Sequence, residues 1–309
     1  MSEKEKDILI LDAGDLLFKK FFTPVLENEV KPATEKARLI VESLNVMGYD
    51  AVGIGDDDLT LGKDSLVEIA KNANFPFLSS NVLDEASGKP LFKPYLLKEV
   101  NGVRIGIFSL LSPDFFPGPS DLRKKGLVFR PPVEVAQAMV KELQPKADLL
   151  ILLSHLGYPK DVELAQAVQG IHVIVGSHTG ANLVYAPVVK GTIILQTSPK
   201  GMYAGKLDLT LRNNEPAFYN AATRKSMENN LNNIKNRLAP AGISEADKAQ
   251  WKKAKEEIER ALRQFEGKDE FTNSILSLGE QIKDHPDILR RVEEYKAKYP
   301  ETGKSPPDK

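Results

Sequence analysis

The chain has 309 residues, of which 41% are hydrophobic and 28% charged, and its formal net charge is −1. This length predicts one domain of about 200 to 250 residues with an extension. The balanced charge excludes the basic surface that nucleic-acid-binding proteins need, and the longest apolar runs, such as residues 149–153, are too short to span a membrane. Because the chain has no cysteine, disulfides, thiolate metal sites and cysteine nucleophiles are also excluded.

The first two thirds of the chain alternate between strand signals and helix signals. Continuous apolar runs predict buried strands at residues 8–11, 51–54, 103–108, 149–153 and 173–175. Helical spacing of apolar residues predicts helices at residues 34–46, 65–70, 133–143 and 161–168. Antiparallel hairpins are expected around Asn101-Gly102 and Lys190-Gly191. Strands with intervening helices favour an α/β fold.

The composition changes after Arg212, where charged helical periodicity replaces the strand signals. Residues on one helix face predict a first helix that carries Met227, Leu231, Ile234 and Leu238. Ser244 is expected to be the N-cap of a second helix, and two shorter helices are expected on either side of His285-Pro286. We therefore predict a helical extension at residues 213–299, packed on the α/β domain or forming a homodimer interface. The polar tail at residues 300–309 is predicted to be disordered.

Polar side chains follow four of the predicted strands at the point where each strand ends. Asp15 follows the first strand, and three consecutive carboxylates begin at Asp56 after the second. His155 and His178 follow the fourth and the fifth strands. A lone Asp after a strand is more often a cap, and a lone His is more often a structural hydrogen-bonding group. Because α/β sheets bind ligands at the carboxyl ends of their strands, the four together favour a metal site.

The segments at these strand ends together resemble the calcineurin-like metallophosphoesterases, in particular the 5′-nucleotidase branch. The matching segments are Asp12-Ala-Gly-Asp15, Val52-Gly-Ile-Gly55, Leu153-Ser-His-Leu-Gly157 and Val173-Ile-Val-Gly-Ser-His178. The resemblance covers residues 7–212 and implies the layered α/β sandwich of the metallophosphoesterase type for a domain at residues 1–212. The C-terminal substrate-binding domain of that branch is not recognisable, and the helical extension stands in its place.

The start of the chain departs from the family pattern. Residues 1–7 are charged and lack the apolar core of an export signal. The family's first strand, which carries an Asp-x-His motif, has no counterpart before Ile8. We expect that the domain lacks this strand because the chain is a truncated form of its parent. The chain itself does not set a localisation, and the resemblance implies a periplasmic or other extracytoplasmic place if an N-terminal segment is missing.

The resemblance implies one complete metal site. Asp15 takes the place of the Asp that bridges two metals in the family, and Asp56 replaces an Asn ligand while keeping an oxygen donor. His155 and His178 match the two remaining ligands of the same metal. Two carboxylates and two imidazoles suit Mn, Zn or Fe, so one divalent ion is the expected cofactor.

The second metal site and the general acid of the family are not matched. Gly180 stands at the position of the last histidine ligand of that site. The family's general-acid histidine matches Asp57, and a carboxylate beside a divalent cation is stabilised in its charged form. Asp57 is therefore the candidate catalytic residue by position, but its chemistry does not suit a proton donor beside a metal ion.

Several other polar residues are expected to have structural roles. Asp12 is expected to form hydrogen bonds at a strand end, and Asp58 to be a partner in a hydrogen-bond network. His172, at the start of a strand, and His285, before a proline, are expected to be structural. The segment at residues 115–119 is compatible with a lid and with a partner surface, and the sequence favours neither.

Two functions of different class stay open. The first is a metal-dependent phosphoester hydrolase resembling 5′-nucleotidases, weak or altered, that acts on a phosphate-bearing small molecule such as a nucleotide. The second is a non-catalytic metal-binding, ligand-binding or scaffold module on the same fold. Metal content and the hydrolysis of an aryl phosphate distinguish the two.

Overall fold

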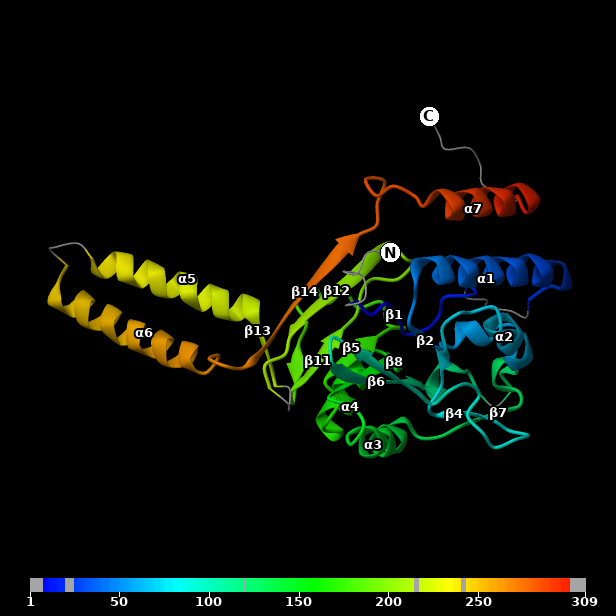
Figure 1. Ribbon diagram of the computed structural model, residues 1–309, viewed down its shortest axis with the longest axis horizontal. Coiled ribbons are helices and arrows are strands. Elements are labelled where there is room, and N and C mark those ends of the chain that lie inside the picture. Colours follow the sequence, from blue (N-terminus) through cyan, green and yellow to red (C-terminus); the bar gives the residue numbers. More distant parts are fainter. Residues whose placement is uncertain (1–7, 20–24, 119, 214–216, 240–242, 301–309) are drawn as a thin grey trace. The chain divides into compact units, whose positions relative to one another are not determined.

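The computed structural model describes residues 8–19, 25–118, 120–213, 217–239 and 243–300 (Figure 1). The predictions made for residues 1–7 and for the tail at 301–309 lie outside these residues. The chain forms two compact units. The first runs to residue 183, resumes at 187–204 and takes in residues from 277 onward, and the second comprises 184–186 and 205–276.

A six-stranded sheet forms the centre of the first unit. Its strand order is β10-β11-β9-β8-β6-β5, with β10 at Val188–Val189, β11 at Thr192–Leu195, β9 at Val173–Gly176, β8 at Leu149–His155, β6 at Val103–Leu111 and β5 at Tyr95–Val100. Strand β8 is buried along its whole length because it pairs in parallel with β6 and β9. Its last residue, His155, is therefore held at the carboxyl end of the sheet.

The two predicted hairpins are confirmed, and they form the two edges of this sheet. Asn101 and Gly102 have φ angles of 52° and 77°, and Lys190 and Gly191 have φ angles of 51° and 89°. Two consecutive residues with positive φ make the tight turn whose twist matches that of antiparallel strands. The turns join β5 to β6 and β10 to β11.

A second, three-stranded parallel sheet lies in the same unit, with β2 (Ala51–Gly53) between β1 (Leu11–Asp12) and β3 (Phe77–Leu78). The first strand is shorter and later than the predicted residues 8–11, since the Ile10 amide donates to the Asp50 carboxylate (2.8 Å) and not to a strand neighbour. Two short strands, β4 (Val82–Asp84) and β7 (Leu127–Phe129), pair antiparallel in a separate two-stranded sheet.

The four predicted helices of this unit are present and cover the two sheets. Helices α1 (Glu27–Met47) and α2 (Lys63–Ala70) contribute Val41, Leu44 and Leu66 to one core with β2 and β3. Helices α3 (Pro132–Leu143) and α4 (Tyr158–Ala167) pack into a second core with β6 and β8. The α/β fold class is confirmed, and within the described residues no helix is both long and apolar enough to cross a bilayer.

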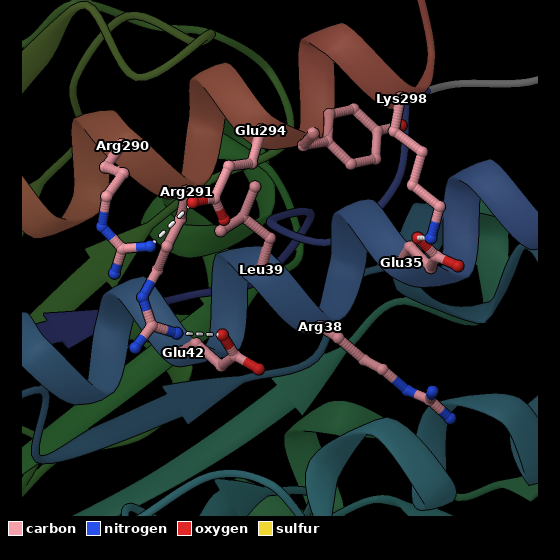
Figure 2. A pocket seen from close by; sticks show the side chains of 9 residues that line it. Glu35, Arg38, Leu39, Glu42, Arg290, Arg291, Glu294 and Lys298 are labelled. Carbon is pink, nitrogen blue, oxygen red and sulfur yellow. Dashed lines mark hydrogen bonds and ion pairs between the residues drawn. The ribbon is translucent and has the colours of Figure 1, made fainter.

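Helix α7 (Pro286–Lys298) belongs to the first unit and lies along α1 (Figure 2). Ion pairs link Arg291 to Glu42 and Lys298 to Glu35. A pocket of about 510 Å³ between the two helices is lined mostly by charged side chains. Exposed ion pairs of this kind contribute little to stability, and none of the predicted site residues lines this pocket.

The second unit combines a sheet of order β12-β14-β13 with a helical hairpin. Its strands are β12 (Tyr203–Thr210), β13 (Phe218–Asn220) and β14 (Asp269–Ser277), and its helices are α5 (Ala221–Leu238) and α6 (Glu245–Arg263). The two helices lie side by side (Figure 1). Helix α5 carries the predicted apolar stripe, of which Leu231 and Ile234 are buried. Ser244 caps α6 as predicted, because its hydroxyl accepts from the Asp247 amide (3.1 Å).

The prediction of a wholly helical extension is wrong at two strands, β13 and β14. The first of the two short helices expected near His285-Pro286 is strand β14, while the second is α7. Strand β14 pairs in parallel with β13, and its Phe271 is buried at 1% exposure. This partner lies far away in the sequence, so the pattern within one segment does not reveal it. Residue 212, where the first domain was predicted to end, lies inside the second unit.

Candidate metal centre

Four predicted residues meet at one point of the first unit. Asp15, Asp56, His155 and His178 each offer one ligand atom, and these atoms all lie within 4.8 Å of one another. Each residue comes from a strand end or from the loop that follows it, after β1, β2, β8 and β9 respectively. Within the described residues this is the one group of three or more such side chains with that geometry.

The distances between the ligand atoms fit a metal ion. His155 Nε2 lies 3.2 Å from Asp15 Oδ2 and 3.2 Å from Asp56 Oδ1. His178 Nδ1 lies 3.2 Å from Asp56 Oδ1 and 3.3 Å from His155 Nε2. Ligand atoms about 2.1 Å from a tetrahedral ion stand about 3.4 Å apart. The nitrogen and oxygen donors present therefore fit a borderline divalent ion in both chemistry and spacing.

The surroundings of His155 select the ring nitrogen that faces the cluster. Nδ1 lies 3.0 Å from the Ala13 carbonyl oxygen and 2.6 Å from Ser177 Oγ. A carbonyl only accepts, so Nδ1 carries a proton and Nε2 is the ring atom left to meet the ligand oxygens. Burial lowers the pKa of His155, but the carboxylates of Asp15 and Asp56 outweigh burial and raise that pKa to about 10. The cluster thus favours a cation at this point.

Asp15 is held in an unusual backbone conformation by Asp58. Asp15 has a φ of 62°, which few residues other than glycine adopt. Its amide donates to Asp58 Oδ2 (2.8 Å), as does the Gly55 amide (2.9 Å). A Cβ on Gly55 would lie 2.1 Å from Asp15 Oδ1, so this position requires glycine. The predicted network role of Asp58 is confirmed by these bonds.

Asp57, the candidate catalytic residue, begins the short helix η2 (Asp57–Leu59) beside the cluster. Its amide donates to Asp15 Oδ1 (2.8 Å). Its carboxylate lies 3.3 Å from Arg123 Nη1, and Arg123 also lies 2.7 Å from Asp56 Oδ2. A carboxylate in an ion pair with a guanidinium stays charged, which does not suit a proton donor. No sequence pattern points to Arg123, since only the folded chain brings it to Asp56.

Phe115 is a second residue whose place the sequence left open. Its ring stacks on His178, with centroids 3.3 Å apart and planes 13° apart, and meets the His155 ring edge-on at 5.8 Å. Phe115 thus covers the imidazoles of the cluster. Pro119, at the end of the same predicted segment, lies outside the described residues.

The remaining sequence expectations concern residues around the cluster. The Gly14 amide donates to Asp12 Oδ1 (2.9 Å), as expected for a strand-end hydrogen bond, and burial raises the pKa of Asp12 to about 7. Gly180 has a φ of 67°, and a Cβ there would lie 3.2 Å from Pro199 Cδ. A larger residue at position 180 would therefore need both backbone strain and movement of the proline. The structure thus offers little room for a histidine at this position.

Comparisons with known proteins find relatives in sequence and in fold. No protein-family model matches the chain. The 5′-nucleotidase of Vibrio cholerae is 30% identical over 239 residues, which cover 67% of this chain and 42% of that protein. The solved sulfate thiohydrolase SoxB of Thermus thermophilus matches 96% of this chain and 44% of its own, with a TM-score of 0.68 and 19% identity. The calcineurin-like phosphoesterase YfkN of Bacillus subtilis matches 94% of this chain and 83% of its own, with a TM-score of 0.63 and 19% identity.

The two structural likenesses confirm the fold expected from the strand-end segments. At their level of identity they bear on the fold alone. The chain spans less than half the length, 42%, of the first curated relative that it matches.

Proposed function

We propose that this chain, which belongs to the calcineurin-like metallophosphoesterase superfamily and to its 5′-nucleotidase branch, binds one divalent metal ion and hydrolyses phosphoric monoesters weakly. The observation that supports the proposal is the convergence of four ligand atoms within 4.8 Å. A relative at 30% identity is a 5′-nucleotidase, so a phosphate-bearing small molecule such as a nucleotide is the proposed substrate.

Each residue of the cluster has a task that follows from its contacts. Asp15, Asp56, His155 and His178 would hold the ion, which supplies Lewis acidity toward a phosphoryl oxygen. Ala13 keeps the proton of His155 on Nδ1 (3.0 Å), so that Nε2 is free to act as a ligand.

The absence of the family's general-acid histidine is the reason that we expect weak activity. The family's acid position is held by Asp57, whose carboxylate is engaged by Arg123 Nη1 at 3.3 Å and is no substitute for an imidazole proton donor. The departing oxygen must then take its proton from water. General acid catalysis contributes about a hundredfold to ten-thousandfold to such reactions, and we expect the rate to be lower by a factor of this order.

A non-catalytic metal-binding module is the second candidate. The contact of Asp57 with Arg123 favours this candidate, because it leaves the position of the family's general acid without a proton donor. Metal binding alone does not separate this candidate from the hydrolase, so turnover must be measured as well.

The test compares the unaltered protein with His155→Ala and with His285→Ala as the control. Mn²⁺ content is measured after equilibration, followed by the release of nitrophenol from p-nitrophenyl phosphate. We expect the unaltered protein and His285→Ala to bind about one Mn²⁺ per chain and to turn over slowly, and His155→Ala to lose both properties. If the unaltered protein neither binds Mn²⁺ nor releases nitrophenol, the proposal is wrong. Bound metal without turnover would leave the non-catalytic module.

A further inference from the structure

The guanidinium of Arg123, on the short helix η4 (Leu122–Lys124), is engaged on every side. Nη1 donates to Asp56 Oδ2 (2.7 Å) and Asp57 Oδ1 (3.3 Å). Nη2 donates to Asp121 Oδ2 (2.9 Å) and to the Phe115 carbonyl (3.1 Å), and Nε donates to Asp121 Oδ1 (3.2 Å). A guanidinium has five N–H groups, and these five contacts use all of them. Arg123 therefore has no donor left for a substrate phosphate.

The contacts of Arg123 fix the orientation of Asp56. The Asp56 side chain is 3% exposed and that of Arg123 is 20% exposed, so water competes little for their contact. Asp56 Oδ2 faces Arg123, while Oδ1 faces the nitrogens of His155 and His178 at 3.2 Å each. Rotation of the carboxylate away from the histidines would break the bond to Arg123, and this bond is charge-assisted and short.

The same geometry accounts for a carboxylate at position 56. Both oxygens of Asp56 must accept, one from Arg123 and one toward the cation position between the histidines. An amide offers a single accepting oxygen, so its NH₂ group would face either Arg123 or the cation. The Arg123 side chain and the carboxylate of Asp56 thus form a matched pair. Asp121 holds the arginine in place through a bidentate contact.

We propose that Arg123 is a positioning residue of the metal centre, which holds Asp56 Oδ1 toward the ion. This inference rests on the proposed metal site and extends it to a residue outside the four ligands. Loss of a hydrogen-bond partner behind a metal ligand weakens metal affinity by about tenfold to a hundredfold. Lysine keeps the charge but not the planar fork, so it replaces arginine only in part.

The experiment measures the Mn²⁺ dissociation constant of the full chain by isothermal titration. The variants are Arg123→Gln, Arg123→Lys, Asp56→Asn and the double variant Asp56→Asn/Arg123→Gln. Lys125→Gln, which removes a charge from an exposed residue of the same segment, is the matched control. Circular dichroism of each variant shows that it has folded.

We expect Arg123→Gln to raise the dissociation constant by about tenfold or more, Arg123→Lys to raise it less, and Lys125→Gln to leave it within about twofold. With asparagine at position 56, removal of Arg123 should cost less than about threefold, because the matched pair is already broken. This coupling separates positioning from a general structural effect, which would reduce the affinity equally in both backgrounds.

Three results would overturn the inference. Equal losses in the two backgrounds would show that Arg123 does not act through Asp56. Tighter Mn²⁺ binding by Arg123→Gln would show that the guanidinium mainly repels the ion. An unchanged dissociation constant would show that Asp56 needs no support. If the unaltered protein binds no Mn²⁺, the proposed metal site itself fails, and that outcome is distinct from the other three.

Discussion

The buried carboxylate of Asp58 joins the two loops that carry Asp15 and Asp56. It accepts the amides of Asp15 and Gly55 through Oδ2, and those of Leu16 and Leu17 through Oδ1, at 2.8 to 3.0 Å. Burial and then the charge of Asp15 raise its pKa to about 6. The sequence showed three adjacent carboxylates, and only the fold distinguishes Asp58, which accepts backbone amides, from Asp56 and Asp57, which both contact Arg123.

Asp58→Asn should destabilise the protein. One accepting oxygen becomes a donor that faces two backbone N–H groups, and leaving buried donors without acceptors costs about 1 to 3 kcal/mol for each group. Urea unfolding at neutral pH should show a loss of about 2 kcal/mol or more. Asp64→Asn, at an exposed position in α2, is the control and should change stability by less than about 0.5 kcal/mol. Equal stability of Asp58→Asn and the unaltered protein would contradict this account.

Local sequence predicted some elements well and did not predict others. The hairpins were predictable because Asn101-Gly102 and Lys190-Gly191 accept positive φ angles within a few residues. Strand β14 was not predictable, because its partner β13 is distant in the chain. The start of helix α6 was predictable from its N-cap, Ser244, which is a local feature.

The contact between β8 and the start of β9 should make stability depend on pH. His172 Nδ1 accepts from the Leu150 amide (2.9 Å), and burial lowers the pKa of His172 below its ordinary value of 6.5. Protonation therefore favours the unfolded state. The contribution of His172 is fully present above the unfolded pKa and is lost as the pH falls below it.

Asparagine can keep an accepting oxygen near the place of Nδ1 without titrating. The free energy of unfolding, measured in urea at about pH 7.5 and about pH 5, should fall less on acidification in His172→Asn than in the unaltered protein. His285→Asn, at an exposed position, should behave like the unaltered protein. If the stability of His172→Asn depends on pH in the same way as that of the unaltered protein, His172 is not the cause of the pH dependence.

At the scale of the whole molecule, all four proposed ligands lie in the first unit, while α5 and α6 belong to the second. A ligand that binds only the folded state stabilises it by about 2.7 kcal/mol at a hundred times its dissociation constant. Mn²⁺ should therefore slow hydrogen exchange of amides in β8 and β9. Amides in α5 and α6 should be unaffected, and slowing there would show that binding is coupled to the second unit.

Chelation offers the reverse test on the same protein. Addition of a chelator should return the exchange of β8 and β9 amides to the rate without metal, since the effect depends on the bound fraction. Exchange that stays slow after the metal is removed would point to a conformational change that outlasts binding.

Sequence alone was enough to predict the α/β class, five strands of the first unit and the positions of Asp15, Asp56, His155 and His178 at strand ends. These are consequences of short-range patterns, because apolar runs, turn residues and polar residues after strands all act within a few positions. The tertiary structure alone brought Arg123 to Asp56 and Phe115 to His178, and gave β14 its partner. Such contacts join residues far apart in the chain, and their geometry arises only when the strands pair and the loops between them close over the sheet edge.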